Sequence, residues 1–174
     1  MVAKIIHKKI PGFTLVDMTL YVAICSILLF SLSTLFAHLV GARVKSQAVN
    51  EVNQQGEFLL YSLTHAIRNA QSIDVPLMGT SSQAMSITTF TPSLNPTVFS
   101  ASSSTFFVQE AGGASIPITN NRVSVSNLLF ENVSSASSTD RIVRIMFTLS
   151  TRTQATQQEY MYTKTFKGSA TLRQ

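Results

Sequence analysis

The sequence predicts an α+β fold in which a long N-terminal helix packs on an antiparallel β-sheet head domain. Three observations predict it. Residues 13–41 are almost wholly apolar, residues 42–73 repeat apolar side chains at helical spacing, and residues 74–174 are rich in Ser, Thr and β-branched residues. The helix therefore has a transmembrane half and an amphipathic half. With 174 residues, the chain has room for one domain and an appendage, but not for two full-sized domains.

The charge of the chain is low and unevenly placed. Charged residues make up 12% of it, about half the proportion usual in soluble proteins. The net charge of +5 depends on residues 1–12, which hold Lys4, Lys8 and Lys9. Beyond them, ten basic residues face eight acidic ones, and the resulting charge of +2 gives little support for an anionic partner. The single cysteine, Cys25, excludes an intrachain disulfide and a zinc site with several cysteines.

The apolar run at residues 13–41 is long enough to cross a membrane. It contains one carboxylate, Asp17, and one histidine, His38, but no Lys or Arg. Residues 18–40 alone would reach about 34 Å as an α-helix, against about 30 Å for the hydrocarbon core of a bilayer. We therefore expect a single membrane-spanning helix.

The residues that flank the apolar run predict its orientation. Three lysines precede the span, whereas Arg43 and Lys45 follow it, so the positive-inside rule places the N-terminus in the cytoplasm and the head domain outside. Two other interpretations stay open: a helix buried in a protein core, and a secretory signal peptide cleaved at the small residues 40–42. Against a signal peptide, its apolar region is normally about 7 to 15 residues long and lacks an acid.

Residues 42–73 predict the amphipathic half of the helix. Their apolar side chains recur every three or four residues, with amide and acidic residues between them. The stripe comprises Val49, Val52, Leu59, Leu60, Leu63, Ile67 and Ala70. Gly56 lies within this half at a cost of about 1 kcal/mol relative to Ala, which indicates a bend or a close contact. Pro76 and Gly79 are expected to end the helix.

The β-rich region at residues 74–174 contains five candidate strands, each rich in β-branched and aromatic residues. They lie at residues 85–90, 105–109, 122–130, 141–149 and 159–172. In the fourth, Ile145 and Phe147 would share one face of a regular strand, whereas Ile142 would lie on the other, so the apolar alternation has a phase slip of one residue. Residues 111–114, Ala-Gly-Gly-Ala, predict a turn.

The junction before the apolar run is the most specific motif in the chain. Residues 8–17 read KKIPGFTLVD, which resembles the processing site of type IV prepilins and pseudopilins. In that family a short basic leader ends in glycine, a prepilin peptidase cuts after it, the new N-terminal residue is N-methylated, and an acid stands fifth in the mature chain. The resemblance implies that the bond between Gly12 and Phe13 is cut, that Phe13 is N-methylated, and that Asp17 takes the acidic place, where the family usually has Glu.

The same resemblance implies an organisation and a function. Residues 1–12 are then a leader peptide, residues 13–41 a transmembrane and filament-core helix, and residues 42–174 a head domain. The chain resembles minor pilins or pseudopilins of the J or W kind, which are structural subunits of a type IV pilus or a type II secretion-like filament. The implied partners are prepilin peptidase, other pilins or pseudopilins, the inner-membrane assembly platform and membrane lipid. The implied location is the cytoplasmic (inner) membrane and then the filament.

Asp17 has a physical reason to act in assembly. A carboxylate at the middle of a membrane helix costs about 2.5 to 3.5 kcal/mol, and less near the interface, so an acid kept in a span favours a functional role. Cleavage would create a positive partner at the amine of Phe13, which a neighbouring subunit could present. The alternative is an interfacial acid solvated by lipid headgroups.

Catalytic chemistry finds no support in the sequence. His7, His38 and His65 are the only histidines, and none lies in the β-rich region. No base for a Ser-His-acid arrangement, no metal cluster and no cofactor site is therefore expected. The chain is predicted not to be an enzyme.

A second functional class is a membrane-anchored binding module, for example one that binds DNA in a competence pilus. Its basic face would consist of Arg122, Arg141, Arg144 and Arg152. Against this interpretation, Arg141 and Arg144 would point to opposite faces of a regular strand.

Overall fold

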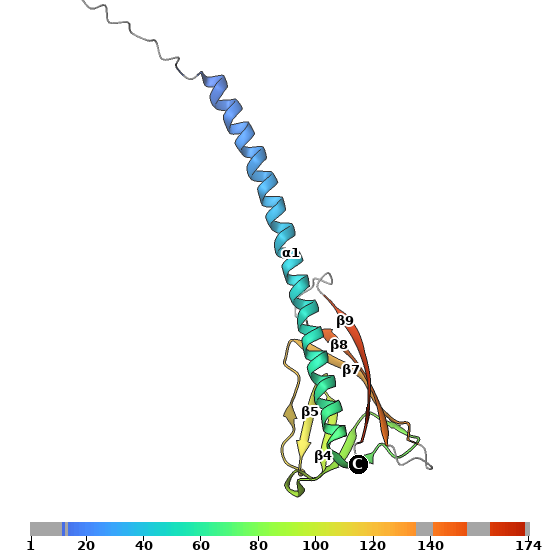
Figure 1. The fold of residues 1–174 in the computed structure, drawn as a ribbon. Helices are drawn as coiled ribbons and strands as arrows, with labels where there is room; N and C mark the ends of the chain where they lie inside the picture. Colours follow the sequence, from blue (N-terminus) through green and yellow to red (C-terminus); the bar gives the residue numbers. More distant parts are fainter. Residues whose placement is uncertain (1–11, 13, 135–140, 153–160, 173–174) are drawn as a thin grey trace, which may run out of the picture. The chain divides into compact units, whose positions relative to one another are not determined.

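The structure is a computed structural model that describes residues 12, 14–134, 141–152 and 161–172 (Figure 1). The chain forms two compact units, Met1–Arg43 and Val44–Gln174. One helix, α1 (Leu15–Arg68), supplies residues to both units, and the described strands belong to the second. The long helix with its two antiparallel sheets confirms the predicted α+β fold.

The first half of α1 has the length and composition of a membrane-spanning helix. Its most apolar stretch has a mean hydropathy of 2.2, and none of that stretch is buried. The hydroxyls of Thr19, Ser26 and Thr34 each donate a hydrogen bond of 2.8 to 2.9 Å to a backbone carbonyl three or four residues earlier. Because these hydroxyls are satisfied within the helix, they do not oppose its burial in lipid.

The second half of α1 packs on the sheets along one stripe. Its buried residues are Val52, Gly56, Leu59, Leu63 and Ile67. Their spacings of three and four residues confirm the amphipathic pattern. At Gly56 the helix passes so close to Phe166 that an added Cβ would lie 2.1 Å from the ring carbon Cζ. Gly56 therefore marks a close contact, and α1 continues through it without a break.

The strands form two antiparallel sheets beside the second half of α1 (Figure 1). The first sheet, in the order β1-β3-β4-β5-β6, contains Ala70–Val75, Met85–Thr89, Thr97–Ser102, Thr105–Glu110 and Ile116–Pro117. The second sheet, in the order β2-β7-β8-β9, contains Ser81–Ser82, Val123–Asn132, Ile142–Thr151 and Thr163–Thr171. A short 3-10 helix, η1 (Pro92–Leu94), precedes β4. The turn predicted at residues 111–114 follows β5, where the N–H of Gly113 donates to the carbonyl of Glu110 at 2.8 Å.

The core of the second unit joins α1 to both sheets. Its largest fully buried side chains include Phe106 from β5, Phe130 from β7 and Phe147 from β8. The ring of Phe147 stacks on that of Phe166 from β9, with the centroids 5.4 Å apart. Burying a side chain of this size stabilises the fold by about 1.5 to 3 kcal/mol. Residues from α1 and from both sheets share one cluster, so the head has a single hydrophobic core.

The structure corrects the predicted end of the helix. The sequence predicts an amphipathic helix over residues 42–73, but α1 ends at Arg68 and Ala70–Val75 form strand β1. Ala70 is buried as a strand residue, not as part of the helical stripe. The physical reason is that β1 can pair with β3, and this pairing takes the segment from the helix before Pro76 is reached.

All five predicted strands are present, but β1 and β4, each longer than β3, are missed, as are two strands of two residues each. All five candidates overlap β3, β5, β7, β8 and β9. Strand β4 and the two-residue strands β2 and β6 lie outside these five candidates, in segments rich in Ser, Thr or Pro. The phase slip expected in β8 lies instead in β7, where pairing with β8 changes register between Ser126 and Leu129.

Candidate functional site at the start of the helix

The junction residues lie just before α1 and in its first turn. Gly12 is exposed, and an added Cβ there would meet no atom within 4 Å. Phe13 lies outside the described residues. Asp17 lies in the first turn of α1 and is exposed. Because α1 begins at Leu15, the peptide bond after Gly12 precedes the helix.

Thr14 and Asp17 form a reciprocal cap at the helix start. The backbone N–H of Thr14 donates to Oδ2 of Asp17 at 3.1 Å, and the N–H of Asp17 lies 3.3 Å from the hydroxyl of Thr14. The Thr14 hydroxyl also donates to Oδ2 of Asp17 at 2.7 Å. This arrangement is a capping box, which satisfies backbone donors that the first turn of a helix leaves unpaired.

The cap gives Asp17 a local function that the sequence analysis missed. The signal was present, because a Thr followed three residues later by an acid, just before an apolar run, is the pattern of a capping box. A carboxylate in the first turn also interacts favourably with the positive end of the helix dipole. Thr14 therefore joins Gly12, Phe13 and Asp17 as a candidate functional residue.

One carboxylate oxygen of Asp17 accepts no hydrogen bond from the described residues. Both hydrogen bonds from Thr14 go to Oδ2, and Oδ1 accepts none from the described residues. Within the same part of the chain, no Lys, Arg or His makes an ion pair with Asp17. The carboxylate is thus held in one orientation by Thr14 while its charge and one oxygen are left for an outside donor.

The span that follows Asp17 presents large apolar side chains to its surroundings. Examples are Ile27, Phe30 and Phe36, which are 70%, 73% and 68% exposed. Exposing such surface to water costs about 25 cal/mol for each Å². A helix of this kind is therefore stable in lipid or against other apolar helices, and both environments exclude water from it.

The four arginines proposed as a DNA-binding face do not gather. Nη1 of Arg144 forms an ion pair with Oε2 of Glu131 at 2.8 Å, across β7 and β8. Arg141 and Arg152 flank opposite ends of β8, a strand that spans about 33 Å at 3.3 Å per residue. Only Arg122 and Arg152 are neighbours, since the N–H of Arg152 donates to the carbonyl of Arg122 at 2.7 Å.

The two histidines that the structure describes also lie far apart along α1. His38 lies in the exposed apolar half of α1, whereas His65 stacks on Tyr61 with a centroid distance of 6.0 Å. His7 lies outside the described residues. Among the residues that the structure places, no three His, Cys, Asp or Glu side chains come close enough together to hold a metal ion.

Comparisons of the chain with protein-family models, with curated proteins and with solved structures found no match. The junction, the capped helix start and the apolar span are the features of the chain that bear on its function.

Proposed function

We propose that this chain is a minor pilin or pseudopilin, a structural subunit that assembles through its N-terminal helix into a type IV pilus or a type II secretion-like filament. The observation that carries the proposal is the order of features at the start of α1. An exposed Gly12 precedes the helix, and five residues later comes an acid with no charged partner among the described residues. A long apolar span follows directly.

Processing comes first in this proposal. Prepilin peptidase cuts after Gly12, and the new N-terminal residue, Phe13, is N-methylated. The lack of a Cβ at Gly12 lets a protease approach the backbone closely at the membrane surface, and no described atom obstructs it. The start of α1 at Leu15 supports this step, because the scissile bond is not part of the helix.

Assembly follows from the charges at the new terminus. The free amine of Phe13 in one subunit pairs with Asp17 of a neighbour, through the oxygen that Thr14 leaves open. In an apolar filament core an unpaired carboxylate would be strongly unfavourable, so this pairing favours one axial register between neighbouring helices. Other pilins or pseudopilins and the inner-membrane assembly platform are the partners in this step.

The proposed location is the cytoplasmic (inner) membrane, with the N-terminus inside and the head outside, and then the filament. We propose a structural role and no catalytic activity. The alternative, a membrane-anchored module that binds DNA, is not favoured by any observation on the head, since its four arginines are dispersed and one is paired with Glu131.

Mass spectrometry of membrane or filament fractions tests the processing step. We expect an N-terminal peptide that starts at Phe13 and carries one additional methyl group. Gly12→Val should abolish the cut, whereas Ala42→Leu should leave it intact. A mature chain that starts at Arg43, and that is lost in Ala42→Leu, would identify a secretory signal peptide and refute the proposal.

A further inference from the structure

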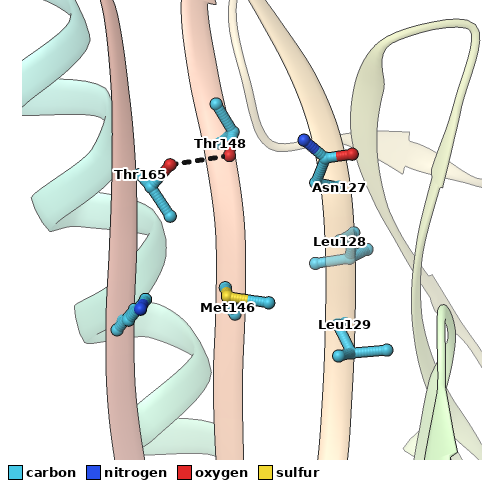
Figure 2. A pocket seen from close by; sticks show the side chains of 7 residues that line it. Asn127, Leu128, Leu129, Met146, Thr148 and Thr165 are labelled. Carbon is cyan, nitrogen blue, oxygen red and sulfur yellow. Dashed lines mark hydrogen bonds between the residues drawn. The ribbon is translucent and has the colours of Figure 1, made fainter.

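The second sheet carries a hollow on its solvent face, the face turned away from α1 (Figure 2). It is shallow and largely open to solvent, with a volume of about 530 Å³. We call it the outer-sheet hollow. It is lined by Asn127, Leu128, Leu129, Met146, Thr148, Thr165 and Lys167.

A β-bulge in β7 builds this hollow. Ser126 pairs with Thr148 and Leu129 pairs with Met146, so two residues of β7 stand opposite one of β8. Asn127, at the bulge, has a φ of +50°, a left-handed conformation that Asn tolerates better than most residues. The extra residue reverses the alternation of β7, so Leu128 is buried and Leu129 is turned to the solvent face beside Met146.

The pair of Leu129 and Met146 is unusual for its surroundings. The other outward positions on β7, β8 and β9 are mostly hydroxyl side chains, namely Ser124, Ser126, Ser150, Thr163, Ser169 and Thr171. Lys167 stands directly opposite Met146 on the neighbouring strand. One row across three strands therefore reads Leu129, Met146 and Lys167, an apolar floor with a cation at one end.

The charge of Lys167 is uncommitted in the part of the chain that the structure describes. It makes no ion pair or hydrogen bond there, whereas Lys164 on the same strand donates to Oδ1 of Asn53 at 2.7 Å. The nearest outward acid on β7, Glu131, is already held by Arg144 at 2.8 Å. A ligand with a carboxylate would therefore meet a free cation rather than a neutralised one.

Along the strand direction, a polar pair lies on each side of the row formed by Leu129, Met146 and Lys167. At one end the hydroxyls of Thr148 and Thr165 are hydrogen-bonded at 2.9 Å, as Figure 2 shows, and at the other lies the pair of Arg144 and Glu131. Thr148 and Arg144 are four residues apart on β8, or about 13 Å. This length accommodates one large apolar side chain, whereas a long acyl chain would extend past the polar pairs.

We propose that the outer-sheet hollow binds the C-terminal residue of a partner polypeptide that ends in a large apolar side chain. The side chain would lie on Leu129 and Met146, and the terminal carboxylate would pair with Lys167. The spacing fits this ligand. Opposite residues on neighbouring strands, such as Met146 and Lys167, lie about 5 Å apart. In a C-terminal residue, the end of the side chain and the carboxylate are attached to one Cα and are separated by a similar distance. The amide of Asn127 supplies a donor and an acceptor for the peptide backbone. This proposal goes beyond filament assembly and does not depend on it.

Methyl NMR of the full chain in nanodiscs of zwitterionic lipid tests the binding. The six methionines are labelled with ¹³C at the methyl group, and the signal of Met146 is assigned by its loss in Met146→Leu. N-acetyl-leucine, which combines the side chain with a carboxylate, should shift the Met146 signal saturably. N-acetyl-leucinamide, which lacks the charge, should bind at least ten-fold more weakly. Met85, which is fully buried in the core, should not respond to either compound.

Two variants separate the two parts of the site. Lys167→Gln should reduce the preference for N-acetyl-leucine at least ten-fold and leave the binding of the leucinamide unchanged, whereas Lys164→Gln should alter neither. Leu129→Ser should weaken the binding of both compounds. The proposal is wrong if no saturable shift occurs, if the two compounds bind equally, or if the preference survives Lys167→Gln. Tighter binding of octanoate than of N-acetyl-leucine would indicate a lipid ligand and would also overturn it.

Discussion

Gly56→Ala tests the close approach of α1 to Phe166 of β9, because helix propensity and packing predict opposite changes in stability. Helix propensity alone favours Ala over Gly by about 1 kcal/mol. Against this, the new Cβ would lie 2.1 Å from Cζ of Phe166, and 2.3 and 2.5 Å from the two ε carbons of the same ring. These distances are far inside van der Waals contact, so either the ring or the helix must move.

The packing around the ring decides the size of the effect. Phe166 is 6% exposed and stacks on Phe147 at 5.4 Å, so a shift of its ring would disturb this packing. Overpacking of a core costs about 1 to 3 kcal/mol, and a clash with three ring atoms favours the upper value. After the gain in helix propensity is subtracted, we expect Gly56→Ala to destabilise the head by about 2 kcal/mol.

The free energy of unfolding can be measured by pulse proteolysis of the full chain in urea. In a Phe166→Leu background the clash is relieved, so Gly56→Ala should cost at least about 1 kcal/mol less than in the parent. Gln54→Ala, at an exposed position on the same helix, should change stability by less than about 0.5 kcal/mol. A stabilising Gly56→Ala, or an equal cost in both backgrounds, would refute the argument from the close contact.

Two further predictions concern the buried stripe and the capped helix start. Leu63 is fully buried, so Leu63→Ala should cost about 2 to 5 kcal/mol in the same unfolding assay, while Tyr61→Ala, at an exposed position, should cost much less. Unchanged stability of Leu63→Ala would show that this contact contributes little. The variants Asp17→Ala and Asp17→Asn should both insert into the membrane and be cut after Gly12. They should not crosslink to partner pilins, because the partner's amine then lacks a counter-charge, which destabilises the assembly by about 3 to 5 kcal/mol. Asp17→Glu should assemble. Normal incorporation of the Asn variant would show that Asp17 only caps the start of α1 together with Thr14 and does not pair with a partner's amine.

The end of α1 illustrates where local patterns mislead. Ala70 continues the helical spacing of Leu63 and Ile67, so periodicity extends the helix to residue 73. In the structure the segment pairs with β3 instead, and Ile73 is buried as a strand residue. The local pattern of this segment does not distinguish a helix from a strand. Pairing with β3, which follows later in the sequence, selects the strand.

The bulge in β7 illustrates a second kind of failure. The sequence of β7, VSVSNLLFEN, has two leucines in a row, and alternation alone cannot say which of them faces the core. The register with β8 makes that choice and turns Leu129 outward. The outer-sheet hollow therefore could not be predicted, since its lining comes from three strands and depends on a single extra residue.

By itself, the sequence determined the long helix, its apolar and amphipathic halves, the β-rich head and the junction residues Gly12 and Asp17. These features depend on composition and on spacing within one segment, which a linear chain displays directly. Only the tertiary structure decided that α1 ends at Arg68, that the strands divide into two sheets, and that Gly56 faces Phe166. The physical reason is that periodicity identifies the buried face of an element, whereas the partner of that face is chosen by packing between segments far apart in the chain.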